Sequence, residues 1–251
     1  MRKLSTALMA AAVLAACDGL DSPLEPAADA QFSSVTATGP AGAALYEIQV
    51  TNLTDGQPLT PPLVATHRPP IDLFDVGQPA SAEIQQIAEN GNLGPMVEAL
   101  EASKHVAAVV VAVGNPVPPL LPGETRSFTI AAETGAKHLS MAAMLICTND
   151  GFTGINGVRL PRDIGSSLTI ETNAYDAGTE TNTENFDNLV PPCGPLTGID
   201  SGGAGTGMSD PALAEGGVIH PHEGISGAAD LLTELHGWAD PVARVVITRV
   251  Q

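Results

Sequence analysis

Oxygen-bearing side chains are concentrated in two stretches of this sequence. TNDGFTGING covers residues 148–157, and NAYDAGTETNTEN covers residues 173–185. Neither stretch contains Lys or Arg, and together they hold four acids. Calcium takes about six to eight oxygen ligands from carboxylates, amides, backbone carbonyls and water, and glycines permit the backbone turns that aim carbonyls inward. The two stretches therefore predict a site for a divalent cation.

Predicted strands place each stretch. The apolar run HLSMAAMLICT at residues 138–148 predicts a strand that ends where the first stretch begins, so that stretch is expected to be a loop. SSLTIETNAYD at residues 166–176 predicts a strand that leads into the second stretch. If both strand ends lie at one rim of a sheet, their oxygens converge. The alternative needs no metal, because Asn and Asp commonly form Asx turns with nearby backbone N–H groups.

The motif His220-Pro221-His222-Glu223 is a second candidate for chemistry. Two imidazoles and a carboxylate within four residues could bind zinc or act as acid and base, as a metal-dependent hydrolase of envelope polymers requires. A catalytic zinc site needs a third ligand that the sequence does not place, and Pro221 indicates an irregular loop. The alternative is a pair of loop histidines with local hydrogen bonds.

The first residues have the pattern of a secretory signal peptide. Arg2 and Lys3 precede an apolar run at residues 7–16 that ends in small residues. This run is too short for a permanent membrane helix, which needs about 20 apolar residues. Residues 1–16 are therefore expected to be removed.

A lipid anchor is expected to follow. Residues 14–17, Leu-Ala-Ala-Cys, resemble the bacterial lipobox, in which a lipid is attached to the cysteine, here Cys17. The alternative is an ordinary signal cleaved near Ala16. Residues 17–43 are rich in Pro, Gly, Ala and Ser and predict a flexible tether. The expected location is the bacterial cell envelope, periplasmic or surface, with the lipid anchor as the sole membrane contact.

Cys147 and Cys193 remain once Cys17 is assigned to the lipid. An even pair in a chain bound for an oxidising compartment favours a disulfide. The alternative is two unpaired thiols, because the sequence does not place their Cα atoms within bridging distance.

The formal net charge is −18, from 10 Lys and Arg against 28 Asp and Glu. Such a surface disfavours nucleic acid and anionic membrane surfaces as partners and favours divalent cations. The alternative is that the acidity only keeps an exported protein soluble.

Residues 44–251 are expected to form one domain, because no internal repeat or second linker interrupts them. Two short helices are predicted, from Ser81 to Glu89 with Ser81 as N-cap, and from Pro95 to Ser103. Residues 52–70 contain five prolines and are expected to cross the domain without regular structure. Further strands are predicted at residues 44–50, 105–113, 125–133 and 241–250. Several strands with turn-rich connections and only two short inserted helices predict an all-β fold, an antiparallel β-sandwich.

The last predicted strand carries apolar residues on both faces. Alternation places Val242, Val246 and Val250 on one face and Ala243, Val245 and Ile247 on the other. Such a strand is expected to lie at the centre of a sheet.

Four segments together resemble the spondin N-terminal domain, found in the animal matrix proteins F-spondin and mindin and as a lone domain in bacterial exported proteins. They are YEIQVTNLTDGQPLTPPLVATH (46–67), AMLICTNDGFTGINGVRLP (143–161), NAYDAGTET (173–181) and DPVARVVITRV (240–250). The resemblance spans roughly residues 44–250. It implies an antiparallel β-sandwich similar to the calcium-dependent lipid-binding sandwiches, with a divalent-metal site among loops at one end.

Mapped onto the family pattern, the metal-binding carboxylates are Asp150, Asp176 and Glu180, and the expected ion is Ca2+. Animal members have Asp at the positions of Glu180 and Asn156 and Trp at the position of Gly151. The amide of Asn156 keeps an oxygen but loses a charge. The absent indole removes any partner contact that it makes in those members.

The sequence thus predicts an exported, lipid-anchored, calcium-binding adhesion or recognition module that is not an enzyme. Its partner is expected to be an unknown protein or glycan at the cell surface. The alternatives are a metal-dependent envelope hydrolase that uses His220, His222 and Glu223, and a purely structural envelope protein.

Overall fold

The computed structural model describes residues 42–199 and 205–251. The described residues belong to one compact unit, Phe32–Gln251, and the other unit, Met1–Gln31, lies outside them. The predicted signal peptide, the lipobox with Cys17 and nearly all of the predicted tether therefore also lie outside the described residues. Within the described residues, no helix has the length and apolar character needed to cross a bilayer.

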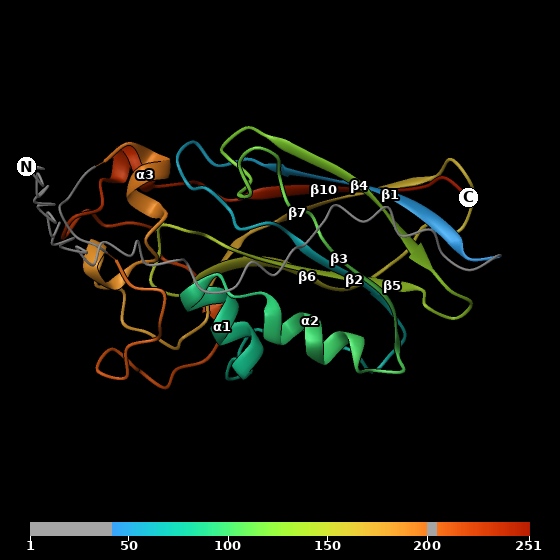
Figure 1. The fold of residues 1–251 in the computed structure, drawn as a ribbon, viewed down its shortest axis with the longest axis horizontal. Helices are drawn as coiled ribbons and strands as arrows, with labels where there is room; N and C mark the ends of the chain where they lie inside the picture. The colour runs from blue at the N-terminus through green and yellow to red at the C-terminus, as the bar shows by residue number, and fades with distance from the viewer. Residues whose placement is uncertain (1–41, 200–204) are drawn as a thin grey trace, which may run out of the picture. The chain divides into compact units, whose positions relative to one another are not determined.

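Two antiparallel sheets form the framework of the unit (Figure 1). The four-stranded sheet has the order β4-β1-β10-β7, with bounds Thr125–Ala132, Ala44–Asn52, Ala243–Arg249 and Ser167–Thr172. The six-stranded sheet has the order β3-β2-β5-β6-β8-β9, with bounds Val106–Val111, Leu63–His67, His138–Met144, Gly151–Arg159, Ala174–Asp176 and His220–Pro221. The prediction of an all-β antiparallel sandwich is confirmed.

Each face of the six-stranded sheet packs against a separate apolar core. Ile48 from β1, Val245 from β10 and Met141 from β5 are buried in the core between the two sheets. Met144 from β5 and Ile84 belong to the second core, on the other face of the sheet. The helices α1, Ala82–Asn90, and α2, Gly94–Glu101, cover that face, as Figure 1 shows. Since successive residues of a strand point to opposite faces, residues 141–144 of β5 contribute apolar side chains to both cores in turn.

The two predicted helices are present. Helix α1, Ala82–Asn90, begins at Ser81, whose hydroxyl accepts a hydrogen bond from the Ile84 N–H, and ends at Gly91 in the left-handed conformation. Helix α2, Gly94–Glu101, has a proline in its first turn. Three further short helical segments were not predicted: η1, Phe186–Asn188; α3, Cys193–Thr197; and α4, Thr233–His236.

Strand β2 lies where the sequence predicted an irregular crossing. All five of its residues are buried, and it pairs with β3 on one side and β5 on the other. The prolines that suggested irregularity precede and follow the strand, so none of them removes an N–H from its ladder.

Strand β6 corrects the prediction of a loop at residues 148–157. Its glycines are needed inside the sheet, because a Cβ at Gly154 would lie 2.5 Å from the Met141 carbonyl oxygen and 2.8 Å from the Phe74 ring. A second correction concerns residues 166–176, which form two strands. β7 belongs to the four-stranded sheet and β8 to the six-stranded sheet, so the chain changes sheets at Asn173.

The predicted disulfide is present between Cys147 and Cys193. It joins the turn after β5 to the start of α3, with 5.1 Å between the two Cα atoms. The disulfide thereby attaches α3, which follows the second acidic stretch, to the six-stranded sheet, which carries the first acidic stretch.

The C-terminal strand β10 is central, as predicted, since it pairs with β1 on one side and β7 on the other. Its two faces differ more than the sequence indicated. Val245 and Ile247 are fully buried, whereas Val246 is only partly buried and Arg244 is exposed. The central position therefore follows from pairing on both edges and not from burial of both faces.

We expect Ile247→Ala to lower the free energy of unfolding by about 2–5 kcal/mol, because it removes buried methyl groups between the sheets and leaves a cavity. The matched change Val246→Ala, on the other face of the same strand, should cost about 1 kcal/mol or less. Urea denaturation of both variants measures the difference. Equal losses would contradict the assignment of the buried face.

Candidate metal centre

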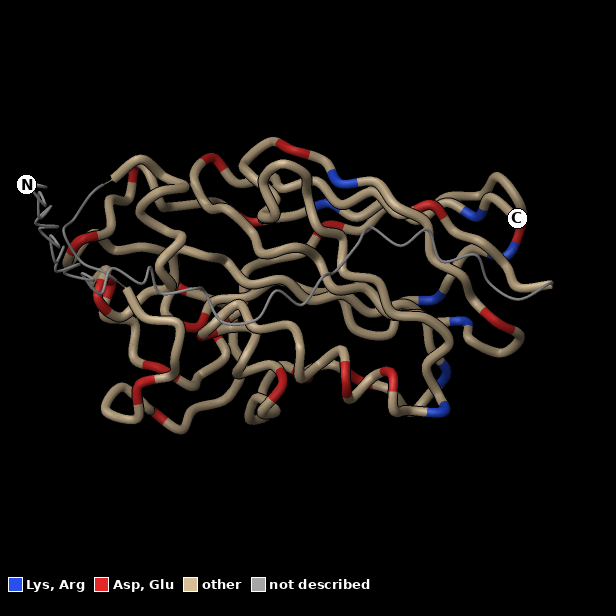
Figure 2. Tube along the Cα trace, viewed as in Figure 1, with Lys and Arg blue, Asp and Glu red and all other residues tan. Residues whose placement is uncertain are grey.

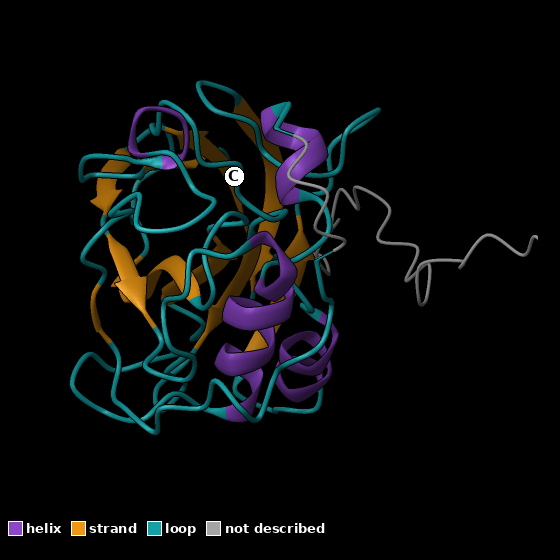
Figure 3. Ribbon diagram, turned by 90° about the vertical axis from the view of Figure 1, so that its left-hand side faces the viewer, coloured by secondary structure: helices purple, strands orange, loops and turns teal. Residues whose placement is uncertain are grey.

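The two acidic stretches meet at one end of the six-stranded sheet. Asp150 directly precedes β6 and Asp176 is the last residue of β8. These strands pair with Gly151 opposite Asp176, and the Ala177 N–H donates to the Asp150 carbonyl oxygen at 3.1 Å. On the other side of β8, His220 of β9 pairs with Asp176. Figure 3 looks onto the end of the unit where the connecting loops gather.

Asp150 is fully buried and has one carboxylate oxygen without a partner. Its Oδ2 accepts three hydrogen bonds, from the Thr179 N–H at 2.8 Å, the Thr179 hydroxyl at 3.1 Å and the Glu180 N–H at 3.0 Å. Its Oδ1 is equally buried and accepts none from the described residues. Burial, and next the charge of Asp176, raise the pKa of Asp150 to about 6, although the hydrogen bonds oppose this shift.

Asp176 is the second buried carboxylate. Its Oδ1 accepts from the Gly178 N–H at 2.7 Å, and its Oδ2 accepts from the Asn182 amide at 2.6 Å. The ring nitrogen Nε2 of His220 lies 3.6 Å from Oδ1. Among the described residues, His220 is the one basic side chain within ion-pair distance of either aspartate, and it is charged only when protonated. Its hydrogen bond to the Pro221 carbonyl, and then the charge of Asp176, raise the pKa of His220.

Positive side chains lie elsewhere on the unit. In Figure 2, most Lys and Arg residues gather near the C-terminus, whereas the end that carries α3 shows Asp and Glu. The negative charge of Asp150 and Asp176 is therefore not balanced by a nearby Lys or Arg. A buried carboxylate without a counter-charge is costly, and a bound cation removes that cost.

Glu180 contacts Asp150 through its backbone and not through its carboxylate. The side chain is buried, and its Oε1 accepts from the Asp210 N–H at 2.8 Å. Burial, and then the charges of Glu89, Asp150 and Asp210, raise the pKa of Glu180 to about 7. Glu89 is itself buried, and its Oε2 has no partner among the described residues. Sequence reasoning did not identify Glu89, whose position on α1 gives no local signal.

The tightest set of possible ligands differs from the predicted one. Asp176, Glu215 and His220 each bring one ligand atom within 4.8 Å of the others. In the part of the chain that the structure describes, the other such set is Cys147, Cys193 and His236, whose cysteines are bonded to each other. The predicted carboxylates Asp150, Asp176 and Glu180 are neighbours but do not form a set of this tightness. Glu215 was missed because nothing in its local sequence distinguishes it from a surface acid.

Residues 215–218 reach Asp176 because Gly178 lets them approach. The Gly217 N–H donates to the Gly178 carbonyl oxygen at 2.7 Å, and the Glu215 N–H donates to that of Thr179 at 3.3 Å. Gly178 has a φ of +67°, and a Cβ there would lie 2.6 Å from backbone atoms of Val218. Position 178 therefore requires glycine for two reasons. Its backbone is in the left-handed conformation, and a side chain there would clash with the backbone of Val218.

The predicted zinc set His220, His222 and Glu223 is not formed. His222 is buried, and its Nδ1 accepts a hydrogen bond from the Gly224 N–H at 3.0 Å. The proton of the neutral ring must then be on Nε2, which leaves no lone pair for a metal. The ring packs edge-on against Trp238 at 5.0 Å between centroids. His222 is therefore a packed side chain, while His220 alone of the two reaches the carboxylates.

Glu184, the third acid of the second stretch, holds a neighbouring loop and does not face the carboxylates. Its carboxylate accepts hydrogen bonds from the Ser226 N–H and hydroxyl at 2.6 and 2.8 Å and from the Ala228 N–H at 2.9 Å. Burial disfavours its charged form, but these hydrogen bonds outweigh burial and lower the pKa of Glu184.

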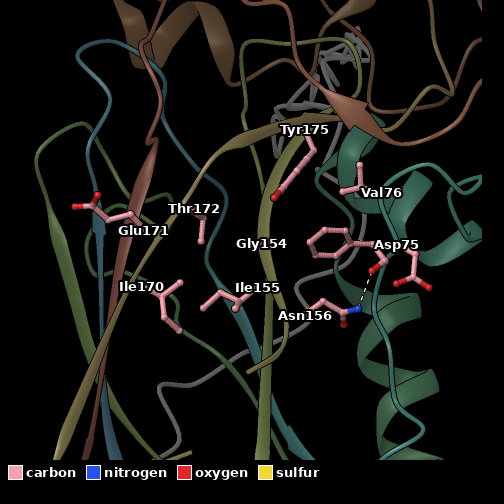
Figure 4. A pocket seen from close by; sticks show the side chains of 10 residues that line it. Asp75, Val76, Gly154, Ile155, Asn156, Ile170, Glu171, Thr172 and Tyr175 are labelled. Carbon is pink, nitrogen blue, oxygen red and sulfur yellow. Dashed lines mark hydrogen bonds between the residues drawn. The ribbon is translucent and has the colours of Figure 1, made fainter. Parts of the chain in front are cut away.

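Asn156 also lies apart from the carboxylates, on a cavity of about 340 Å³ shown in Figure 4. Its amide donates to the Phe74 carbonyl oxygen at 2.8 Å and accepts from the Leu73 N–H at 2.9 Å. An Asp at this position could not donate to that carbonyl. Tyr175 and Glu171 also line the cavity, and Figure 4 shows Glu171 pointing away from Asn156. The cavity and the carboxylate group are therefore separate features.

Without metal, Asp150 and Glu180 should contribute progressively less to the stability of the folded protein as the pH rises from about 5 to about 8. The folded-state pKa values of Asp150 and Glu180, about 6 and about 7, exceed those of the unfolded chain, which are about 4. The folded state therefore binds more protons across this interval, and deprotonation favours unfolding. The titratable groups around these carboxyls are the acids Asp176, Glu89 and Asp210 and the imidazole of His220. His220, whose own pKa is raised, loses its proton in the same direction as the carboxyls.

Melting temperatures in a chelator across this pH range measure the effect. The double variant Asp150→Asn with Glu180→Gln removes both groups, so stability should fall more with rising pH in the wild type than in the variant. Burial lowers the pKa of His67, His222 and His236 in both proteins, so their contribution cancels in this comparison. A difference between the two proteins that is constant or has the opposite sign over the interval would contradict the expectation.

A family model described as Spondin_N matches residues 56–189, slightly more than half of the chain. The match is shorter than the segment of residues 44–250 over which the sequence resembles the family. It includes Asp150, Asp176 and Glu180, whereas Glu215 and His220 lie beyond it. A search of curated proteins gave no match. The family is a non-enzymatic domain type and is typically extracellular. The chain belongs to the spondin N-terminal domain family.

Proposed function

We propose that this protein is an exported, lipid-anchored spondin-type module that binds Ca2+ and serves in adhesion or recognition at the cell surface. The observation that carries the calcium site is the unpartnered, fully buried Oδ1 of Asp150 beside the buried carboxylate of Asp176. Among the described residues, no hydrogen-bond donor contacts this oxygen, and no Lys or Arg forms an ion pair with either carboxylate. A divalent cation supplies the missing positive charge.

The donor set suits calcium. Carboxylates of Asp150, Asp176 and Glu180 are hard oxygen ligands, and the side-chain oxygens of Thr179 and Asn182 lie in the same loop. Calcium binds in irregular geometries with about six to eight oxygens, which suits a site made of loop residues. Direct ligation by Glu180 requires its carboxylate to turn from the Asp210 N–H toward Asp150. Bound Ca2+ would offset the burial and, next, the repulsion that raise the pKa of Asp150 and Glu180.

The role is binding and not turnover. The family is a non-enzymatic domain type, and the structure does not assemble His220, His222 and Glu223 into the ligand set of a hydrolase. An ion that orders the loop at residues 177–182 would also shape the surface that this loop presents. The partner in this proposal is a protein or glycan at the cell surface. Gly151, where animal members have Trp, offers no side chain to such a partner.

Export and anchoring rest on the first 17 residues. A charged start, a short apolar run and the sequence Leu-Ala-Ala-Cys at residues 14–17 are the features of a lipoprotein signal. The lipid on Cys17 and the tether that follows would hold the sandwich at the envelope with its metal site free to meet a partner. A single acyl chain gives only marginal membrane binding, so more than one chain is needed for a stable anchor.

Calcium should raise the melting temperature of the metal-free protein. A ligand that binds only the folded state stabilises it by about 2.7 kcal/mol at a concentration one hundred times its dissociation constant. Asp150→Asn and Asp176→Asn should each abolish most of this gain, because each removes a ligand charge. Calorimetry of the metal-free proteins with and without millimolar Ca2+ makes the measurement.

The matched control is Asp187→Asn, which changes an exposed acid in η1 and should leave the gain intact. Asp150→Asn should fold well without metal, since it removes a buried charge. If millimolar Ca2+ does not change the melting temperature of the wild-type protein, the proposed calcium site is wrong.

Cys17→Ser should move the protein from the membrane fraction to the soluble fraction of cells that produce it, because the lipid is attached to this thiol. Ser22→Ala, in the predicted tether, is the control and should stay with the membranes. Fractionation followed by immunoblotting measures both. A Cys17→Ser protein that remains membrane-bound would show that something other than a lipid on Cys17 holds it.

A further inference from the structure

His220 is held in the tautomer that a metal ligand requires. Its Nδ1 lies 2.9 Å from the carbonyl oxygen of Pro221. A carbonyl oxygen can only accept, so Nδ1 carries the proton of the neutral ring and Nε2 carries the lone pair. Histidines that bind metals commonly donate their other ring N–H to a backbone carbonyl in this way, which fixes the ring's orientation.

The lone pair of His220 faces a carboxylate. Nε2 lies 3.6 Å from Oδ1 of Asp176, which is buried. Two acceptors that face each other repel unless a proton or a metal ion lies between them. Glu215 adds a third acceptor, and one ligand atom from each of the three residues lies within 4.8 Å of the others. When the His220 ring is neutral, the group therefore consists of converging electron-pair donors, and among the described residues no Lys or Arg pairs with them. A proton on Nε2 and a metal ion compete for the same lone pair.

The spacing fits a small divalent ion. In a tetrahedral zinc site, nitrogen and oxygen ligands lie about 2.0–2.2 Å from the metal, which puts two ligands about 3.3–3.6 Å apart. The separation of 3.6 Å between His220 and Asp176 matches this value. Asp150 is fully buried, its Oδ1 has no partner among the described residues, and its backbone carbonyl accepts a hydrogen bond from Ala177, the residue after Asp176. The charges of Asp176 and Asp150 interact, as do those of Asp150 and His220, so an unsatisfied buried carboxylate oxygen belongs to the same electrostatic group.

We propose that Asp176, Glu215 and His220 coordinate a divalent transition-metal ion of the zinc class. Imidazole nitrogen suits Zn2+ and its neighbours in the transition series, whereas Ca2+ prefers oxygen throughout its shell. The proposal rests on the proposed role of Asp176 as a metal ligand and adds two ligands from outside the segment that matches the family. The centre would accordingly discriminate between ions through His220, which takes part in zinc-class binding and not in calcium binding.

Isothermal titration of the full, metal-free chain with Zn2+, and separately with Ca2+, tests this. We expect His220→Gln to raise the dissociation constant for Zn2+ by about tenfold or more and to change that for Ca2+ by less than about twofold. Glu215→Gln should also weaken Zn2+ binding. The control His105→Gln changes a histidine outside this ligand set and should bind Zn2+ like the wild type. Titration with Co2+ gives a second readout, because loss of a nitrogen ligand alters its visible absorption.

The outcomes separate this inference from the calcium proposal. Equal Zn2+ affinity and equal Co2+ spectra in wild type and His220→Gln, or no Zn2+ binding by the wild type, would overturn the inference and leave the calcium proposal standing. Zn2+ binding that depends on His220, together with no Ca2+ binding, would support the inference and overturn the calcium proposal. Melting temperatures in a chelator check that the variants fold. Folding is expected, because Glu215 is exposed and His220 is half-exposed.

Discussion

The structure depends on a concentration of negative charge at the point where β6 and β8 pair. Asp150 and Asp176 are both buried there, one at the start of β6 and the other at the end of β8. Removing carboxylates from water costs free energy that nearby charges or hydrogen bonds must offset. Hydrogen bonds from residues 178–182 offset part of it and leave one oxygen of Asp150 unsatisfied. The remaining imbalance is the physical reason to expect a cation.

The rest of the unit keeps that charge concentrated. Two apolar cores, one between the sheets and one under the helices, hold the six-stranded sheet on both faces. The register of β6 with β8 and of β8 with β9 then fixes which side chains meet. The disulfide between Cys147 and Cys193 ties down the chain on either side of the acidic loop. A rigid scaffold of this kind prevents the carboxylates from relieving their repulsion by moving apart.

The proposed metal centre would distinguish between ions by the type of ligand it offers. Oxygens from Asp150 and Asp176 favour a hard ion such as Ca2+, while His220 offers the nitrogen that zinc-class ions prefer. Backbone hydrogen bonds join residues 215–218 to the loop after Asp176. A movement of one of these two segments would therefore also move the other. An ion bound there would order both segments together. This arrangement suits a module whose exposed loops contact a partner.

The sequence by itself determined the class of fold, the two helices and the resemblance to the family, and it favoured the disulfide. These follow from local patterns: alternation of apolar residues, Ser81 as a cap, a pair of cysteines once Cys17 is set aside, and short motifs such as NAYDAGTET. It also placed Asp150 and Asp176 at strand ends. It misassigned β2 and β6, because prolines bound the first and glycines within the second resemble loop residues.

Only the tertiary structure decided which side chains share a site. Glu215 and His220 meet Asp176 through strand pairing and a close approach at Gly178, and no pattern along the chain encodes either contact. Glu180 has its carboxylate beside Glu89, a residue 91 positions earlier in the chain. The two histidines differ in tautomer. Nδ1 of His222 accepts a hydrogen bond from a backbone N–H, whereas Nδ1 of His220 donates one to a backbone carbonyl. Periodicity specifies which residues are buried, but the identity of their neighbours depends on how separate strands come together in space.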